Sequence, residues 1–227
     1  MKTFNGRVAV ITGGGSGLGK AFAMAAAQRG MKLVLADIQA DVLEQTVQAL
    51  RSQGTDAVGV VVDVSDAAAV QRLADQAQQS FGPVHVVFNN AGVTAGGLVW
   101  EHSEKDWEWL LGVNLKGVIN GVRCFAPQML AAAAADPAYE GCIVNTASMA
   151  GLLTSPGRGI YSVSKHAVVA LTETLYQDLR LVTDQVGASV LCPYFVPTGI
   201  NQSHRNRPGD LPAEKPTKSQ LIGQAMS

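Results

Sequence analysis

The glycine-rich stretch ITGGGSGLG, at positions 11–19, limits the folds that are open to this chain. It follows the apolar run 8–11, which is typical of a short buried strand, and precedes the Ala-rich segment 20–29, which is typical of a helix. Because glycines lack Cβ, a phosphate can approach the backbone of such a turn, where N–H groups and the positive helix end face it. The stretch does not end in Gly-Lys-Ser/Thr, so it is not a P-loop. An ordinary strand-to-helix turn is the alternative that these residues leave open.

Apolar runs and helical segments alternate along the whole chain. The expected strands are 8–11, 33–36, 57–62, 84–88, 142–145 and 188–192. The expected helices are 20–29, 41–52, 67–81, 107–135 and 162–183. This alternation is typical of a parallel sheet covered on both faces. We therefore predict an α/β fold with a doubly wound, Rossmann-type sheet of six parallel strands. It forms a single domain, 1–227, whose polar end, 199–227, is a substrate-covering flap or a mobile tail.

Polar residues follow the ends of these predicted strands. They are Asp37, Asp63, Asn89, Asn90, Ser148 and Thr198. Ligands of doubly wound sheets bind at the carboxyl ends of the strands, near the point where the strand order reverses. We therefore expect these side chains to line one binding site.

Asp37 indicates which dinucleotide that site takes. It comes 18 positions after Gly19, and a carboxylate there can accept both hydroxyls of an adenosine ribose. Neither Ser16 nor Ile38 is basic, so a 2′-phosphate would lack a partner and would be repelled by Asp37. Two like charges ~4 Å apart cost about 4 kcal/mol at an effective dielectric of ~20, so we expect NAD rather than NADP. The alternative is that Asp37 caps the next helix.

Tyr161 and Lys165 stand four positions apart at the start of a predicted helix, which places them on one face. A free phenol has a pKa of ~10, so it keeps its proton at neutral pH and cannot act as a base. An ammonium ~6 Å away lowers that pKa by roughly two units, so Tyr161 can exchange a proton with an alcohol or ketone. Ser148, at a strand end, can bind the same oxygen. A surface pair without function is the alternative for the Tyr–Lys spacing alone.

Composition limits the binding partners and the cellular compartment that are expected for this chain. Only 15% of residues are charged, against about 25% in typical domains, which suggests a surface covered by another subunit and a homodimer or higher homo-oligomer. A net charge of −1 gives no basic surface for nucleic acid. No apolar run reaches the ~18 residues of a membrane span, and no signal-peptide pattern is present. Cys124, Cys142 and Cys192 are predicted to be buried thiols of a cytoplasmic protein without a metal site.

Several short motifs occur together, in one order along the chain. They are Thr12-Gly13 with Gly17 and Gly19, Asp63-Val64, Asn89-Asn90-Ala91-Gly92, Asn114, Ser148, Tyr161 with Lys165, and Pro193 with Thr198. In this combination and spacing, residues 2–200 resemble the short-chain dehydrogenase/reductase family, in its short single-domain branch.

The resemblance implies a role for each motif. The pyrophosphate of the cofactor would be held by Gly13, Ser16, Gly17, Leu18 and Gly19. The adenine would be contacted by Asp63 and Val64, and cofactor and central strand would be supported by Asn90 and Gly92. The nicotinamide ribose would be bound by Tyr161 and Lys165, and the carboxamide would be fixed by Pro193, Val196 and Thr198. Asn114 would bend its helix and hold a water in a proton relay through Lys165.

Two features depart from the family's pattern. Tyr194 and Phe195 follow Pro193, where the family usually has a glycine, so an aromatic ring is expected to crowd the substrate side of the nicotinamide. The alternative is that Tyr194 packs under the flap. The sequence also stops at Ser227, before the family's seventh strand, so that strand is apparently missing, strand six becomes an edge and tetramer formation is open.

These inferences lead to one predicted function. The chain is expected to be an NAD-dependent oxidoreductase that interconverts a secondary alcohol and a ketone or aldehyde by hydride transfer, with Tyr161 as general acid/base. Ser148 would orient the substrate, while Lys165 and Asn114 support the proton transfer. The candidate substrate-lining residues are Val93, Thr94, Met149, Ala150, Ser155, Arg158, Tyr194 and Phe195. The alternative is a catalytically idle NAD-binding subunit with an incomplete substrate pocket.

Overall fold

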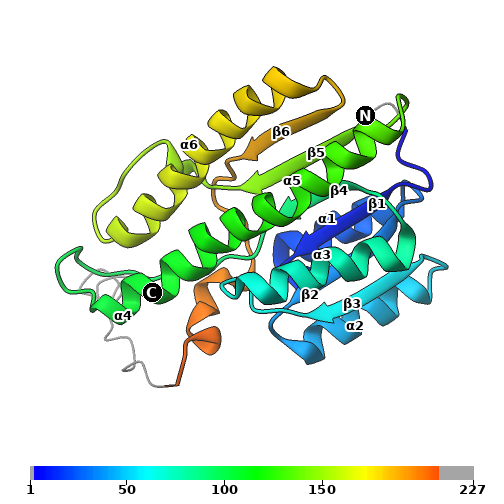
Figure 1. Ribbon diagram of the computed structural model, residues 1–227. Helices are drawn as coiled ribbons and strands as arrows, with labels where there is room; N and C mark the ends of the chain where they lie inside the picture. Colours follow the sequence, from blue (N-terminus) through cyan, green and yellow to red (C-terminus); the bar gives the residue numbers. More distant parts are fainter. Residues whose placement is uncertain (1–2, 210–227) are drawn as a thin grey trace.

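A computed structural model describes residues 3–209, which form a parallel sheet with helices on both of its faces (Figure 1). The sheet has six strands in the order β3-β2-β1-β4-β5-β6, and every neighbouring pair is parallel. The strands are β1 (Val8–Thr12), β2 (Lys32–Asp37), β3 (Ala57–Val61), β4 (Val84–Asn89), β5 (Gly141–Thr146) and β6 (Val186–Leu191). The order reverses between β1 and β4, so the predicted doubly wound α/β fold is confirmed.

The helices cover the sheet in two layers. One face packs on α1 (Gly17–Ala27) and α2 (Ala40–Arg51) through buried residues such as Ile11 and Leu35. The other face packs on α3 (Ala67–Phe81), α5 (Gly117–Ala135) and α6 (Gly159–Val182) through residues such as Val10, Val87 and Phe125. The strands carry apolar side chains toward both layers, which explains why their sequences are continuous apolar runs.

One predicted helix, 107–135, is in fact three segments. The chain winds from α4 (Glu104–Leu111) through a π-helical turn, η1 (Gly112–Lys116), into α5. Helix α4 begins at Glu104 because Ser103 and Asp106 form a capping box, in which each side chain binds the other residue's backbone N–H. The π-turn carries Asn114, so the irregularity falls on a predicted site residue.

The remaining short elements lie beside the carboxyl edge of the sheet. They are two 3₁₀ segments, η2 (Met149–Gly151) after β5 and η3 (Gly199–Asn206) after β6. The predicted flap, 199–227, is described only as far as residue 209; its remainder, 210–227, lies outside the described residues. Within residues 3–209 the sheet has no seventh strand, and β6 forms one edge.

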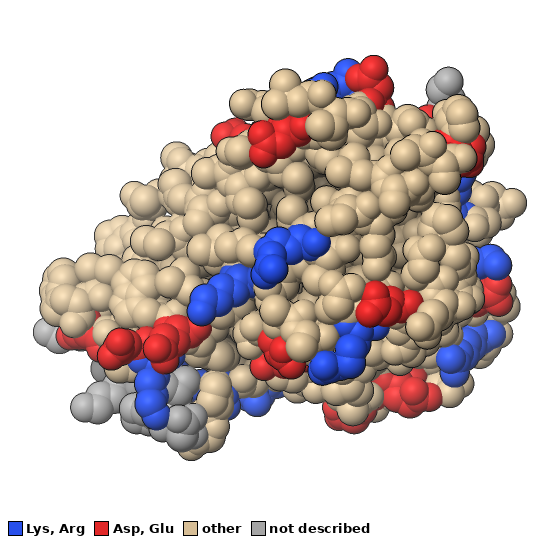
Figure 2. All heavy atoms as spheres, in the orientation of Figure 1, with Lys and Arg blue, Asp and Glu red and all other residues tan. Residues whose placement is uncertain are grey.

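Three further observations concern the surface charge, the membrane-span prediction and the cysteines. The surface between α5 and α6 is largely uncharged, although basic side chains cross the middle of this face and acidic ones lie at its upper rim (Figure 2). None of the described helices combines the length and the apolar character that crossing a bilayer requires. The three cysteines are free thiols as predicted, but each is half-buried and not buried.

Candidate active site

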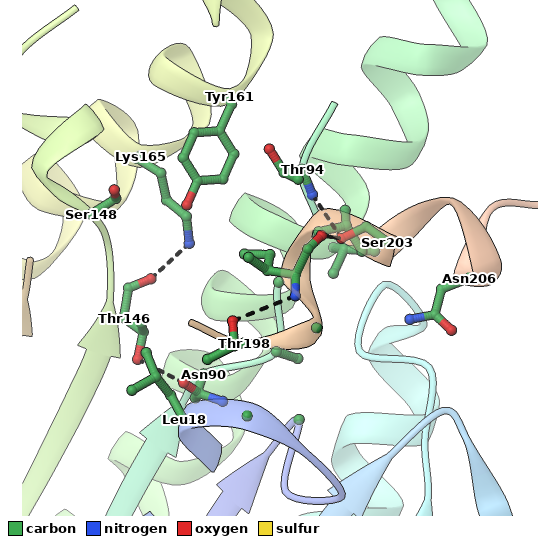
Figure 3. Close-up of a pocket in the computed structure, with 18 of the residues that line it drawn as sticks. Leu18, Asn90, Thr94, Thr146, Ser148, Tyr161, Lys165, Thr198, Ser203 and Asn206 are labelled. Atoms are coloured by element: carbon green, nitrogen blue, oxygen red, sulfur yellow. Dashed lines mark hydrogen bonds between the residues drawn. The ribbon is translucent and has the colours of Figure 1, made fainter. Parts of the chain in front are cut away.

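A cavity of about 850 Å³ opens along the carboxyl ends of the strands (Figure 3). It is lined by fifteen of the predicted site residues: Gly13, Ser16, Gly17, Leu18, Asp37, Asp63, Val64, Asn90, Gly92, Ser148, Tyr161, Lys165, Pro193, Val196 and Thr198. The other two predicted residues, Gly19 and Asn114, are buried behind the wall. The structure therefore brings together residues that are spread over most of the sequence.

The glycine-rich turn between β1 and α1 forms one end of the cavity floor. Gly13 and Gly17 have positive φ angles of 65° and 52°, which only glycine adopts readily. A Cβ on Gly19 would lie 2.0 Å from the carbonyl oxygen of Gly13, so only glycine lets α1 start this close to the turn. Ser16 caps α1 without a side-chain hydrogen bond, and the N-terminus of α1 faces the cavity. This arrangement fits a bound phosphate group.

Asp37 ends β2 beside this turn. Its Oδ2 accepts a hydrogen bond from the Gly15 N–H and its Oδ1 accepts one from the Gln39 N–H, both at 3.0 Å. The N-cap residue of α2 is Gln39, so the alternative that Asp37 caps this helix is wrong, although its bond to the Gln39 N–H orders the backbone just before it. Each oxygen of Asp37 keeps a lone pair for a ribose hydroxyl.

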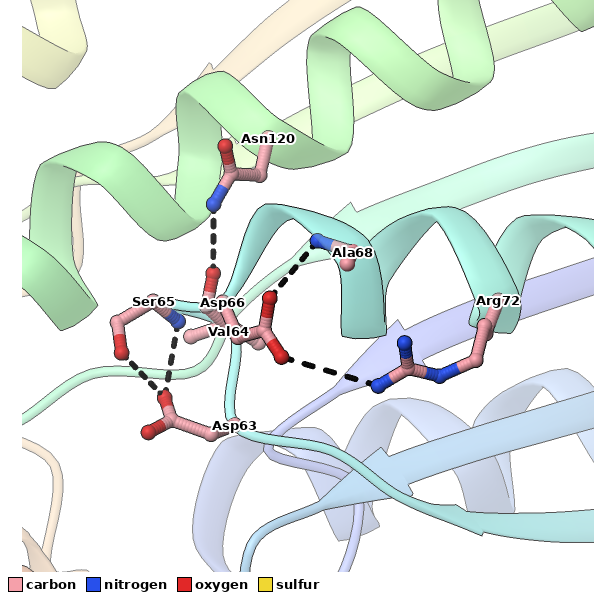
Figure 4. Close-up of polar contacts among 7 residues, drawn as sticks. All are labelled: Asp63, Val64, Ser65, Asp66, Ala68, Arg72 and Asn120. Atoms are coloured by element: carbon pink, nitrogen blue, oxygen red, sulfur yellow. Dashed lines mark hydrogen bonds and ion pairs between the residues drawn. The ribbon is translucent and has the colours of Figure 1, made fainter.

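Asp63 and Val64 form the wall beyond β3 (Figure 4). Asp63 Oδ1 accepts hydrogen bonds from the Ser65 N–H at 2.9 Å and the Ser65 hydroxyl at 2.7 Å. The Val64 carbonyl accepts a bond of 2.9 Å from Asn120 Nδ2 on α5. The loop after β3 is therefore bonded to α5, with Asp63 and Val64 lining the cavity.

A polar network joins the ends of the three central strands. Thr12 Oγ1, at the end of β1, accepts bonds from the Asn90 and Ala91 N–H groups at 2.9 and 3.0 Å. Asn90 Nδ2 donates to the Thr12 carbonyl at 3.1 Å, and Asn90 Oδ1 accepts from Thr146 Oγ1 at 3.3 Å. Lys165 Nζ donates to the Thr146 carbonyl at 2.8 Å. Asn90 thus supports the central strands and, through Thr146, the position of Lys165.

Asn114 lies fully buried in the π-turn. Its Oδ1 accepts from the Val93 N–H at 2.8 Å, while its Nδ2 donates to the Val93 carbonyl at 2.9 Å and to Ser164 Oγ at 3.1 Å. Both Nδ2 hydrogens are used, so the side-chain amide locks the loop after Gly92 onto α6. A Cβ on Gly92 would lie 3.5 Å from Asn114 Oδ1 and 3.6 Å from Lys165 Nζ, which shows how closely these groups meet.

Tyr161, Ser148 and Lys165 meet at the far end of the cavity (Figure 3). Helix α6 begins at Gly159, earlier than predicted, so Tyr161 stands in its first turn and Lys165 one turn later. Nζ of Lys165 lies 5.7 Å from the centre of the Tyr161 ring.

The protonation of this pair differs from the prediction. Burial raises the pKa of Tyr161, although a hydrogen bond with Ser148 and the charge of Arg158 oppose this. Burial also lowers the pKa of Lys165 from 10.5 to about 8, although Cys192 opposes this. The predicted lowering of the Tyr161 pKa by Lys165 is therefore absent in the protein without cofactor, because desolvation of the phenol outweighs it.

Sequence reasoning missed the contacts that hold η3 across the cavity. Ser203 Oγ accepts a bond of 3.1 Å from the Thr94 N–H, and Arg205 Nε donates to Gln39 Oε1 at 3.2 Å. Another contact joins Arg207 to Asp106, a largely buried ion pair with the Arg207 guanidinium 5.3 Å from the Trp109 ring centre. The sequence showed only that 199–227 is polar. That composition does not indicate which distant residues these side chains bind.

The substrate end of the cavity is open. Tyr194 and Phe195 line the cavity with 86% and 75% of their surfaces exposed, so the described part of the flap, 199–209, does not cover Tyr194. The other predicted lining residues, Val93, Thr94, Met149, Ala150, Ser155 and Arg158, also line it. Arg158 Nη1 donates to Thr94 Oγ1 at 3.2 Å.

Comparison with known proteins agrees with this geometry. The model of the short chain dehydrogenase family matches residues 7–209. A short chain dehydrogenase/reductase from Burkholderia phymatum, solved in complex with NAD, is 56% identical with a TM-score of 0.93, over 100% of this chain and 79% of that one. The CLA biosynthesis dehydrogenase/reductase of Lactiplantibacillus plantarum is 36% identical over 92% of this chain and 71% of its own. The C alpha-dehydrogenase of a Sphingobium species is 37% identical over 92% of this chain and 66% of its own.

Proposed function

The chain belongs to the short-chain dehydrogenase/reductase family, and from this premise we propose that it is an NAD-dependent oxidoreductase acting on a secondary alcohol and the corresponding ketone or aldehyde. The observation that carries the proposal is one cavity lined both by the phosphate-binding turn at Gly17 and by Tyr161, Ser148 and Lys165. A dinucleotide that places its phosphates at the turn can reach the tyrosine with its other end.

NAD fits the residues present better than NADP. The carboxylate of Asp37 faces the cavity beside the turn, and it favours ribose hydroxyls and repels a 2′-phosphate. The Burkholderia phymatum relative, solved in complex with NAD, supports this choice. When bound, NAD supplies the acceptor or donor of the hydride.

The protein's own residues would handle the proton. Tyr161 Oη gives its proton to the carbonyl oxygen during reduction and takes it back during oxidation. The raised pKa of Tyr161 keeps the phenol protonated before the cofactor binds, which suits an acid. Ser148 Oγ holds the same substrate oxygen. The Lys165 ammonium, fixed on the Thr146 carbonyl, stabilises the phenolate that forms when the proton leaves.

Asn114 would act behind these groups. Its amide is committed to Val93 and Ser164, so we assign it the role of fixing the loop beneath Lys165. The water of a proton relay would then have to be held by groups of Asn114 other than its amide hydrogens.

The alternative, a catalytically idle NAD-binding subunit, is not favoured by any feature of the site, since Ser148, Tyr161 and Lys165 line one cavity.

Two further expectations, on oligomeric state and on location, accompany the proposal. The largely uncharged surface between α5 and α6 (Figure 2) supports a homodimer or higher homo-oligomer, which sedimentation at micromolar concentration would reveal. A cytoplasmic location rests on the free cysteines.

The test replaces the proposed acid. Tyr161→Phe keeps the ring and removes the proton, so turnover in an alcohol screen followed by NADH absorbance should fall at least ~100-fold, the usual scale of acid–base catalysis. NAD affinity should change little. Tyr176→Phe is the matched control, because Tyr176 is on the same helix with 50% of its surface exposed. A Tyr161→Phe variant with near-normal turnover would refute the mechanism.

A further inference from the structure

An arginine from the flap reaches the dinucleotide end of the cavity. Arg205, in η3, is exposed and lines the cavity together with Gly17, Asp37 and Gln39. Its Nε donates to Gln39 Oε1 at 3.2 Å, although the two residues are 166 positions apart in the chain. The fold therefore brings a basic residue to Gln39, two positions after Asp37.

The guanidinium of Arg205 is held in place by its own segment. Nη1 donates to the carbonyls of Gly199 at 2.8 Å and Gln202 at 3.0 Å. With Nε bound to Gln39, three of the five N–H groups are engaged. The remaining two are on Nη2, for which residues 3–209 provide no hydrogen-bond acceptor. This nitrogen lies next to Gly199, where a built Cβ would be 3.4 Å away.

A chain of close contacts connects this guanidinium to the glycine-rich turn. A Cβ on Gly17 would lie 3.3 Å from Cβ of Thr198, so the base of η3 rests directly on the turn (Figure 3). Gly199 follows Thr198 and contacts Arg205, as described above. The guanidinium is therefore linked to the glycine-rich turn through Gly199 and Thr198.

The charges of the cavity point to an anionic partner for this nitrogen. Among the described lining residues the cations are Arg158, Lys165 and Arg205. Arg158 binds Thr94 at the substrate end, and Lys165 binds the Thr146 carbonyl beside Tyr161. Arg205 is thus the cation at the end that holds the turn. The pyrophosphate of a dinucleotide would otherwise be met there by the backbone N–H groups, the Ser16 hydroxyl and the helix end, none of which carries a full positive charge.

We propose that Arg205 binds the pyrophosphate of the dinucleotide cofactor, with Gln39 as the residue that positions its guanidinium. The proposal rests on the proposed function, since it assumes that the cavity takes NAD. It gives the described part of the flap a second role, because η3 would carry a positive charge to the cofactor.

The test measures binding without turnover. Isothermal titration of NAD and of ADP-ribose, which has the pyrophosphate but no nicotinamide, should give Kd values about tenfold higher for Arg205→Ala, the scale of one charge-assisted hydrogen bond. Arg205→Lys should recover part of the loss. Arg29→Ala is the matched control, because Arg29 is an exposed arginine beyond the other end of α1, bound to the Ala25 carbonyl. It should bind NAD normally. Arg205→Gln replaces Arg205→Ala if the latter fails to fold.

The role of Gln39 is tested in a double-variant cycle. Gln39→Ala should weaken NAD binding in the wild-type background and leave it unchanged in Arg205→Ala, a dependence that a merely structural effect on α2 would not produce.

Each failure has a distinct meaning. Wild-type protein that binds no NAD overturns the proposed function and this inference together. If the wild type and the Arg205 variants bind NAD with the same affinity, the inference alone is overturned. A loss confined to NADP would also overturn it, because Arg205 would then serve a 2′-phosphate instead of the pyrophosphate.

Discussion

Replacing Lys165 by methionine should make the cofactor-free protein more stable while abolishing its activity. Lys165 is 3% exposed, and burial lowers its pKa from 10.5 to about 8. One pKa unit corresponds to about 1.4 kcal/mol, so holding this ammonium charged in the folded protein costs about 3 kcal/mol at pH 7. Methionine removes that cost but leaves the Thr146 carbonyl without its 2.8 Å partner, which costs about 1–2 kcal/mol. The net expectation is a gain of about 1–2 kcal/mol in the free energy of unfolding.

The pH dependence gives the sharper measurement. Between pH 8 and 10.5 the unfolded lysine keeps its proton while the folded one loses it, so the stability of the wild type rises with pH in that window. The advantage of Lys165→Met in urea unfolding, measured at one protein concentration, should therefore be largest at pH 7 and should shrink as the pH rises toward 10. Lys20→Met is the control, because Lys20 is exposed and its replacement should give no comparable trend. A Lys165→Met variant that is less stable than the wild type at pH 7, or an advantage that does not change with pH, would refute the desolvation argument.

Three further predictions concern the cofactor, the flap and the substrate entrance. Asp37→Ala should raise kcat/KM with NADP relative to NAD, because it removes both the ribose contact and the repulsion; a wild type that already prefers NADP contradicts the assignment. Arg207→Ala removes the partner of the largely buried Asp106, so hydrogen exchange around η3 should speed up about tenfold or more, the scale of losing one charged hydrogen bond, while β1 stays protected. Tyr194→Gly widens the cavity mouth and should favour the bulkier members of a series of secondary alcohols; a uniform loss would show that Tyr194 only supports the loop.

Local sequence patterns were sufficient for the architecture. The strands and most helices were predicted within a few residues, and 67–81 matches α3 at both ends, because the apolar period and the turns are local properties. The glycine-rich turn was identified on the same basis. Its glycines are needed for positive φ angles and for close backbone contact, and both are recorded in the residue type itself.

The helix containing Asn114 was predicted less well. A π-turn adds one residue to a helix without changing its composition, so nothing in the apolar period of 107–135 distinguishes it from a regular α-helix. The resemblance implied a bend there, but its form depends on the bonds from Asn114 to Val93 and Ser164, which join three separate elements.

The polar residues of the site could be predicted from the sequence, because they follow the predicted strands. The carboxyl ends of parallel strands lie at one edge of the sheet, independently of the side chains there. Only the folded chain determined their electrostatics. The pKa values of Tyr161 and Lys165 follow from how deeply each group is buried, and burial depends on elements packed from elsewhere. Likewise, Arg205 meets Gln39 and Arg207 meets Asp106 across more than a hundred positions. No local pattern encodes such pairs, because a hydrogen bond or ion pair depends on distance in space, which the chain sets only when the sheet and helices have packed.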